Sequence, residues 1–243
     1  EFAIRPFLEK YPQETMRYML QWSVHSNDNV RRLSSEGCRP RLPWAKGLPQ
    51  LRKDPSPILP ILENLKTDPS EFVRRSVANN LNDISKDHPE LVLGIAERWQ
   101  GSNPETNWII KHGCRTLLKR GHSRVLYLHG FNPKAKAKMK NVHVSEKVTI
   151  GQTLTFRFTF TNKERKSARF RLEYSIEYLT RSGKASLKVF KITENTFEPE
   201  TEITFVRKKS FKDCSTRKHY KGKHRIKILA NGMILCEHEF FVV

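Results

Sequence analysis

Hydrophobic positions along this chain follow two different periods, and the change from one to the other divides the sequence into two parts. In residues 1–131 apolar side chains recur every three or four positions, as Val73, Val77 and Leu81 do, which is the spacing of one face of an α-helix. In residues 142–243 apolar and polar positions alternate, and this predicts strands with one buried face. The sequence therefore predicts a multidomain α + β protein.

Helical patterns recur along the first part in similar units. They cover residues 13–24, then segments that begin near Asn27, at Ser56-Pro57, at Ser70 and at Asp87, and finally residues 105–119. The triplets Val30-Arg31-Arg32, Val73-Arg74-Arg75 and Ile109-Ile110-Lys111 occupy similar places in these units, 43 and 36 residues apart. Such offsets are typical of HEAT-like repeats, which stack into a curved α-solenoid with a concave face.

Basic residues at one place in each repeat would line up along that concave face. Arg31, Arg74 and Lys111 are each explained, taken alone, by a solvated helix surface. As a repeated set they favour a shared ligand surface, because a basic stripe is the expected footprint of a phosphate backbone.

The second part, residues 142–243, contains about seven short alternating segments and predicts an antiparallel β-sandwich. Asn231-Gly232 is a strong hairpin signal, and Ser182-Gly183 is another turn signal. All four tryptophans lie before residue 132, so the immunoglobulin pattern of Cys, Trp and Cys is absent and the description Ig-like depends on architecture. Residues 132–141 combine Asn132-Pro133 with alternating lysines, which predicts a basic linker between domains at 1–131 and 142–243.

Charge indicates what the chain binds. The formal net charge is +20, which favours a polyanionic partner. Residues 1–130 carry 20 basic and 14 acidic side chains, whereas residues 131–243 carry 25 and 11, so the basic excess is largest in the second part. Contact with nucleic acid explains this distribution better than a general role in solubility.

Other classes of protein are disfavoured. No apolar run approaches the length of a membrane span, and no signal peptide is visible, so we expect no membrane partner. The four cysteines are widely spaced and form no CxxC motif, which predicts reduced thiols in a cytoplasmic protein and no metal site. We also expect a monomer that needs no cofactor.

Residues 36–44, with the sequence E-G-C-R-P-R-L-P-W, break the helical pattern that precedes them. Pro40 and Pro43 cannot continue a helix, and each of them pushes the preceding residue toward extended geometry. The resulting stiff turn displays one carboxylate, two guanidinium groups and one indole at close quarters. A site that holds a phosphate backbone and works on a neighbouring base can use all of these groups.

This segment, preceded by Val30-Arg31-Arg32-Leu33, resembles the signature of the AlkC-type DNA alkylation repair glycosylases, which are HEAT-like-repeat enzymes that remove alkylated bases. Residues 1–7 and residues 74–86 resemble two further segments of the same family, in the same order. Some AlkC-type proteins carry a C-terminal Ig-like domain. The resemblance implies a DNA N-glycosylase of base excision repair that acts on alkylated, N-methylated bases in double-stranded DNA. Because the chain opens at Glu1 inside an apparent helix, we expect an N-terminally truncated fragment.

Glu36 is the first candidate for the catalytic carboxylate and Glu1 the second, since both match acidic positions of that family. Cleavage of the glycosidic bond leaves cationic character on the sugar, which a carboxylate stabilises while it orients a water molecule. The alternative for Glu36 is an ion pair with Arg39 or Arg41, because such pairs are common. Trp44 is expected to stack on the sugar or a distorted base, with core packing as its alternative.

Basic and amide side chains of both parts are expected to contact DNA phosphates, which position a protein without specifying sequence. In the first part these are Arg5, Arg39, Arg41, Arg74, Arg75, Asn79, Asn82, Lys86, Lys111 and Arg115. In the second part they are Arg217, Lys218, Lys221 and Lys223. The alternatives are a helix-end network for Asn82 with Asp83, and a solvated strand edge for the second group.

A different class of function also fits the repeats, namely a non-catalytic HEAT-repeat scaffold that binds nucleic acid. Residues 36–44 separate the two readings, because a scaffold does not need a carboxylate in a basic turn fixed by prolines.

Overall fold

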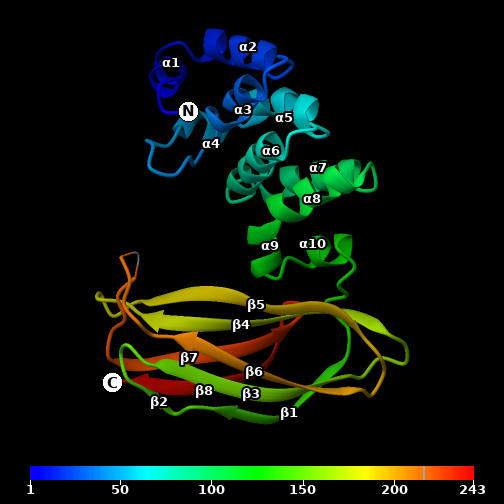
Figure 1. The fold of residues 1–243 in the computed structure, drawn as a ribbon, viewed down its shortest axis with the longest axis vertical. Helices are drawn as coiled ribbons and strands as arrows, with labels where there is room; N and C mark the ends of the chain where they lie inside the picture. Colours follow the sequence, from blue (N-terminus) through cyan, green and yellow to red (C-terminus); the bar gives the residue numbers. More distant parts are fainter. Residues whose placement is uncertain (216) are drawn as a thin grey trace. The chain divides into compact units, whose positions relative to one another are not determined.

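The structure is a computed structural model that describes residues 1–215 and 217–243, and the chain divides into two compact units (Figure 1). The first unit, residues 1–118, is helical, and the second unit, residues 119–243, contains the strands. A helical part followed by an Ig-like β part is therefore the observed order, as the sequence predicts.

The helices of the first unit mostly begin at the signals that the sequence provides. Asn27 caps its helix by accepting a hydrogen bond from the Asn29 N–H at 2.8 Å. Prolines stand in the first turn of several others, where no N–H partner is needed. The helices are α1 (Arg5–Lys10), α2 (Pro12–Trp22), α3 (Asp28–Glu36), α4 (Pro49–Lys53), the 3-10 helix η1 (Ser56–Ile58), α5 (Leu59–Leu65), α6 (Glu71–Ile84), α7 (Pro89–Trp99), α8 (Pro104–Gly113), α9 (Arg115–Lys119) and, in the second unit, α10 (Ser123–Leu128).

Helix α6 is the centre of the first unit, because α3 and α8 both pack against it. The predicted apolar face of α6 is buried, with Val73, Val77 and Leu81 at most 2% exposed. Gly113 lets α8 approach closely, since a Cβ atom there would lie 3.0 Å from the Cβ of Leu81. These contacts bring side chains from three helices, far apart in sequence, to neighbouring positions.

Two helix boundaries differ from the predictions. The helix predicted over residues 105–119 is interrupted at Cys114, which has φ −84° and ψ 4°, so it forms α8 and α9 separately. The first helix begins at Arg5, one residue before Pro6, and Glu1 therefore lies outside it.

The strands of the second unit form two sheets. Their bounds are β1 (Ala137–Val144), β2 (Lys147–Val148), β3 (Thr153–Asn162), β4 (Ala168–Leu179), β5 (Ala185–Phe197), β6 (Glu202–Ser210), β7 (Gly222–Ala230) and β8 (Met233–Val242). One sheet has the order β1-β3-β6 and the other the order β2-β8-β7-β4-β5. The described residues thus form eight strands where the sequence predicts about seven, and the short β2 pairs with β8 in parallel, in contrast to the expected all-antiparallel arrangement.

The core of the second unit lies between these sheets. Phe156, Phe158 and Phe160 of β3 are fully buried, as their alternation predicts. Phe160 meets Phe170 of β4 edge to face at a centroid distance of 5.0 Å. Asn231 and Gly232, with φ of 47° and 80°, connect β7 to β8, so the predicted hairpin turn is confirmed.

The segment predicted as a basic linker, residues 132–141, is largely part of the second unit. Its backbone is anchored, because Asn231 Nδ2 donates to the Asn132 carbonyl at 2.9 Å. From residue 137 onward it is β1, in which exposed Lys138 and Lys140 alternate with the partly buried Met139. The alternating lysines therefore belong to the solvent-facing side of an edge strand, where they discourage pairing with other chains.

We expect Phe158→Ala to lower the free energy of unfolding of the second unit by about 3–5 kcal/mol, because the substitution removes a fully buried ring and leaves a cavity. Leu187→Ala is the matched control, since Leu187 is 55% exposed and its replacement should change stability by less than about 0.5 kcal/mol. Urea unfolding of the whole chain, followed by circular dichroism, measures both values. Equal losses in the two variants would contradict the described core.

Candidate active site

Glu36 is the last residue of α3, and the backbone directly after it is sterically constrained. A Cβ atom at Gly37 would lie 2.7 Å from Ile4 Cγ2 and 2.9 Å from the Leu33 carbonyl oxygen, so only glycine fits there. The chain then turns at Pro40, whose carbonyl accepts a hydrogen bond from the Leu48 N–H at 3.2 Å. Residues 40–48 therefore form a closed loop, which we call the proline loop.

Arg5 holds both ends of this region together. Its guanidinium donates to the carbonyl groups of Gly37 and Arg39 at 3.1 Å each and to that of Lys46 at 3.0 Å. Arg5 is only 4% exposed, and burial lowers its pKa. The prediction that Arg5 contacts DNA is therefore wrong, because the side chain is enclosed and its donors are used by the protein's own backbone.

The two carboxylate oxygens of Glu36 have different surroundings. The side chain is buried, and Oε1 accepts a hydrogen bond from Arg39 Nη1 at 2.5 Å. Among the described residues Oε2 has no hydrogen-bond partner, although it is also buried. Its ion-pair contact is Arg32 Nη2, at 3.5 Å. A buried carboxylate oxygen without a partner is costly and marks a candidate functional site.

Charges of alternating sign continue from Glu36 in one direction toward α6. Arg39 Nε and Nη2 each lie 2.9 Å from Asp83 Oδ2. The other oxygen of Asp83 accepts a hydrogen bond from Lys86 Nζ at 2.9 Å. Asp83 is 2% exposed and Arg39 is 6% exposed, so these contacts are short and almost fully shielded from solvent.

In the other direction the charges are held more loosely. Arg32 Nε lies 3.6 Å from Glu1 Oε1, and it is itself buried without a hydrogen bond among the described residues. Arg32 is instead fixed by Phe72, whose carbonyl accepts from Nη1 at 2.6 Å and whose ring centroid lies 4.0 Å from Cζ. We call the whole series, Glu1–Arg32–Glu36–Arg39–Asp83–Lys86, the ion-pair chain.

The ion-pair chain bears on the roles that the sequence suggests for Glu36 and Arg39. Glu36 does pair with Arg39, as the structural alternative for this carboxylate states. Arg39 itself, predicted to contact a phosphate, is buried between two carboxylates, so that prediction is wrong. Sequence reasoning gave no catalytic role to Arg32 or Asp83. The spacing of Arg32 four residues before Glu36 was the available signal for the first, since such residues share a helix face.

Trp44 is the most exposed large hydrophobic side chain of the proline loop. It is 96% exposed and has a positive φ of 65°, which is uncommon for a residue that has a Cβ atom. The alternative that Trp44 packs in the core is therefore wrong. An exposed indole on a strained backbone is available to a ligand.

Other predicted phosphate contacts of the first unit have partners within the protein. Arg41 pairs with Asp87 at 2.7 Å, and this contact lowers the pKa of the Asp87 carboxyl group. Arg75 pairs with Glu71 at 2.6 Å, but its side chain stays 62% exposed. Arg74 Nη1 donates to backbone carbonyl groups at 2.7 and 2.8 Å.

Asn82 and Asn79 differ in accessibility. Asn82 is 4% exposed, and its Oδ1 accepts hydrogen bonds from the N–H and the hydroxyl of Thr116. Asn82 is therefore used in a contact with the start of α9, which differs from the alternative network with Asp83, and the buried side chain is not accessible to a phosphate. Asn79 is half-buried and accepts from Arg115 Nη2 at 3.1 Å.

Several cations gather around α8 near these amides. Trp108 and His112 of α8 stack with ring centroids 5.0 Å apart. Burial lowers the pKa of His112, and the nearby charges of Arg115 and Arg75 lower it further. Lys111, which lies next to His112 in the chain, is half-buried.

The cations predicted in the second unit fall into two groups. Arg217 lies over the ring of Tyr178, with 4.6 Å from Cζ to the ring centroid. Lys218 and Lys221 are exposed. Lys223 instead pairs with Glu239 at 2.7 Å, so its charge is already balanced.

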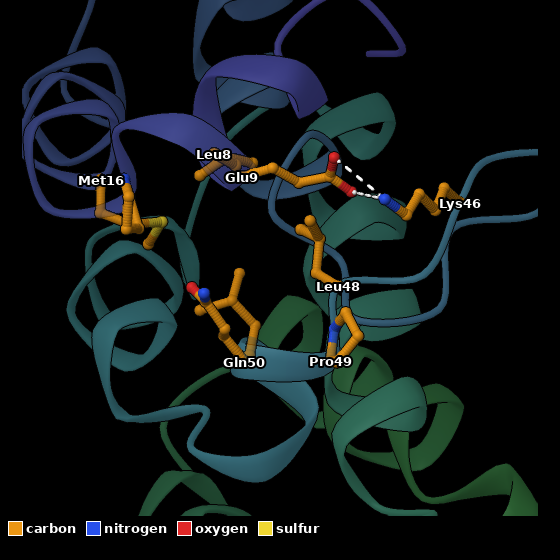
Figure 2. A pocket seen from close by; sticks show the side chains of 9 residues that line it. Leu8, Glu9, Met16, Lys46, Leu48, Pro49 and Gln50 are labelled. Atoms are coloured by element: carbon orange, nitrogen blue, oxygen red, sulfur yellow. Dashed lines mark hydrogen bonds and ion pairs between the residues drawn. The ribbon is translucent and has the colours of Figure 1, made fainter.

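A separate apolar pocket of about 330 Å³ lies between α1, α2 and residues 46–51 (Figure 2). Met16 and Leu48 line it, and the pair Glu9–Lys46, at 3.0 Å, lies at its edge. No member of the ion-pair chain lines this pocket. The ion-pair chain therefore lies outside this pocket.

Across residues 1–215 and 217–243 no group of three or more His, Cys, Asp and Glu side chains is arranged to hold a metal ion. Nor does any helix in this part of the chain have the length and apolar character needed to cross a membrane.

Comparison with known proteins identifies relatives for both units. The family described as "DNA alkylation repair enzyme" matches residues 1–117, and the one described as "Uncharacterised protein YhaZ, C-terminal Ig-like domain" matches residues 138–243. The uncharacterised protein YhaZ of Bacillus subtilis (strain 168) is 46% identical over 243 residues, which are all of this chain and 68% of that protein.

A solved structure matches the whole chain. It is that of the Pseudomonas fluorescens alkylpurine DNA glycosylase AlkC bound to DNA containing an abasic site analog, with a TM-score of 0.96 and 40% identity. The match covers 100% of this chain and 68% of the AlkC chain. The resemblance of residues 1–7, 36–44 and 74–86 to AlkC-type proteins is thereby confirmed, and the chain belongs to the DNA alkylation repair enzyme family.

Proposed function

We propose that this protein is a DNA glycosylase of base excision repair, which hydrolyses the N-glycosidic bond of alkylated, N-methylated bases. The observation that carries the proposal is the buried Glu36 Oε2, which has no hydrogen-bond partner among the described residues. It occurs in a chain whose full length matches a known alkylpurine DNA glycosylase. Glu36 is the proposed catalytic carboxylate, and Glu1, across Arg32 from it, is the second.

The chemistry needs little more than a carboxylate and water. An alkylated base that carries positive charge is already a good leaving group, so a general acid is less necessary. As its bond to the sugar lengthens, positive charge develops on the sugar. A fixed carboxylate stabilises that charge and accepts the proton of the attacking water. No cofactor has a role in this scheme.

HEAT-like repeats account for the helical unit. Arg31 of α3 and Arg74 of α6, which are 43 positions apart, use the same atom in the same way. Each Nη1 donates to the carbonyl groups five and six residues earlier, at 2.7–2.9 Å. Equivalent contacts in α3 and α6 support a repeated unit. These backbone hydrogen bonds also give Arg74 a structural role. The proposed phosphate contacts of the helical unit are therefore Arg75, Lys86, Lys111 and Arg115, with Arg41 and Asn79.

Double-stranded DNA is the proposed partner of both units, the helical one over residues 1–118 and the one that contains the strands over residues 119–243. The second part carries the larger basic excess, with Arg217, Lys218 and Lys221 as its proposed phosphate contacts. The protein is proposed to act as a monomer. The cytoplasm is the proposed location, and four free cysteines suit its reducing conditions.

The second candidate function is a non-catalytic HEAT-repeat scaffold that binds nucleic acid. The observation that favours it is the Glu36–Arg39 ion pair, since a carboxylate held in this way can serve structure alone. The two candidates differ in whether removal of the Glu36 charge affects chemistry.

We expect Glu36→Gln to lower the single-turnover rate of base release from methylated duplex DNA by about a hundred- to a thousand-fold, which corresponds to roughly 2.7–4 kcal/mol. Glutamine keeps the size of the side chain and removes its negative charge. DNA affinity should stay nearly unchanged, because Glu36 is buried.

Glu71→Gln is the matched control for this variant, since Glu71 is exposed and, among the described residues, pairs with Arg75 of its own helix. It should cost at most about 1 kcal/mol of stability and leave base release unchanged. Base release by Glu36→Gln at the rate of the unaltered protein would refute the assignment and favour the scaffold.

Trp44→Ala should weaken binding to alkylated duplex DNA by about 1–3 kcal/mol, the usual contribution of one aromatic stacking contact. The melting temperature should not change, because the indole is 96% exposed. Fluorescence anisotropy with labelled DNA measures the affinity. Tyr18→Ala removes another exposed ring of the helical unit, 43% exposed, and serves as the control. Affinity losses of equal size in both variants would argue against a stacking role for Trp44.

Replacement of Lys218 and Lys221 together by alanine should flatten the dependence of DNA affinity on salt. Each phosphate contact contributes about 0.9 to the slope of log K against log salt, so the slope should fall by about 1.8. Lys223→Gln is the comparison, because the charge of Lys223 is already balanced by Glu239. Titrations at several salt concentrations measure the slopes, and an unchanged slope in the double variant would remove these lysines from the interface.

A further inference from the structure

We propose that Arg39 is a positioning residue, which acts through Glu36 by occupying one of its carboxylate oxygens so that the other faces the reaction. The inference rests on the proposed function and adds a role for a side chain that the sequence placed on DNA. Arg39 is 6% exposed and makes contacts on both sides, with Glu36 Oε1 and with Asp83 Oδ2.

The terminal torsion angle of glutamate is broad and nearly two-fold. Without a bonding partner, the two carboxylate oxygens can therefore exchange positions. Here Arg39 Nη1 lies 2.5 Å from Oε1, and Oε2 has no hydrogen-bond partner among the described residues. One oxygen is therefore used for anchoring and the other is left for chemistry. The arrangement selects Oε2 as the oxygen that accepts the proton.

Arg39 is itself oriented from behind. Nε and Nη2 both lie 2.9 Å from Asp83 Oδ2, which fixes the plane of the guanidinium group. The Asp83 Oδ1 atom accepts from Lys86 Nζ at 2.9 Å. The Arg39 backbone is held as well, since its carbonyl accepts from Arg5 Nη1 at 3.1 Å. The guanidinium therefore cannot follow a moving carboxylate without breaking several contacts.

The charges of this part also balance. Glu36 and Asp83 supply two negative charges, and Arg39 and Lys86 supply two positive ones. A buried carboxylate is tolerated only when such partners compensate for the lost hydration. Arg32 Nη2, 3.5 Å from Glu36 Oε2, adds a further positive charge on the other side of this carboxylate.

The reaction step that this geometry serves is balanced without another reactant. The bond between the sugar carbon and the base nitrogen breaks, and its electron pair goes to the base, which loses its positive charge. The oxygen of a water molecule forms a new bond to the same sugar carbon. One proton of that water passes to Glu36 Oε2. Arg39 takes no part in these bonds, and its effect is on the position of Oε2.

A double-mutant cycle between Arg39 and Glu36 tests the proposal. Arg39→Met is compared with Asp83→Asn, which keeps the shape of the side chain and weakens the support for Arg39. In both variants the single-turnover rate of base release should fall by roughly a hundred-fold, the usual cost of misplacing a reacting group by about an ångström. The dissociation constant for DNA should change less than about two-fold, since neither residue is accessible.

The decisive measurement is made in the Glu36→Gln background. If Arg39 acts through Glu36, its replacement there should cause no further loss of rate, because residues that act as one unit are not additive. Multiplied losses, or a DNA affinity that falls with the rate, would overturn the proposal. Arg52→Met is the control, since Arg52 pairs with Asp87 at the surface, and it should leave the rate constant for base release intact.

Three further outcomes are informative. If Arg39→Met does not fold, as judged by thermal melting, the cycle is completed with Asp83→Asn, and additive losses there overturn the proposal in the same way. If Glu36→Gln alone releases base like the unaltered protein, the proposed function fails, and the role of Arg39 falls with it. If Glu36→Gln is inactive while Arg39→Met and Asp83→Asn both keep the full rate, only the positioning role is overturned.

Discussion

Burial of a carboxylate is costly unless other groups replace the hydration it loses, and Arg39 contributes the short contact to Glu36, which is 5% exposed. The same guanidinium connects α3 to α6 through Asp83, so the contact to Glu36 also fixes the packing of two helices. Among the described residues the other oxygen of Glu36 has no hydrogen bond, and Arg32 lies 3.5 Å from it. Structure and proposed chemistry therefore depend on a single buried ion pair, which a surface pair could not replace because water would screen it.

Arg5 fixes the proline loop to the backbone next to Glu36. Its three carbonyl contacts join the residue after Glu36, Arg39 and the far end of the loop at Lys46. The loop that carries Trp44 is thereby held at both ends, while the indole itself stays in solvent. A rigid base with an exposed ring suits a side chain that must meet a large partner, because little conformational entropy is lost when contact forms.

Local patterns allowed the two-part fold to be predicted. The alternation of Phe156, Phe158 and Phe160 and the turn at Asn231-Gly232 each contain the physical reason for the structure they adopt. The pairing of Glu36 with Arg39 was foreseeable as an alternative, because three residues separate them. The contacts of Arg39 with Asp83 and of Arg5 with Lys46 were not, since they span 44 and 41 residues and exist only once the helices have packed. The lysines of β1 could not be assigned from the sequence for a different reason. An alternating basic stretch is compatible with a linker and with an edge strand.

The ion pair between Glu36, Arg39 and Asp83 also restricts how this protein can evolve. Loss of any one of the three side chains removes a partner from charges that are at most 6% exposed, and breaking a buried ion pair typically destabilises a protein by about 3–5 kcal/mol. That loss is a large fraction of the stability of an ordinary domain. We therefore expect substitutions at these positions to be correlated among related sequences. The evolution of α3 would then be coupled to that of α6, although the two helices are distant in sequence.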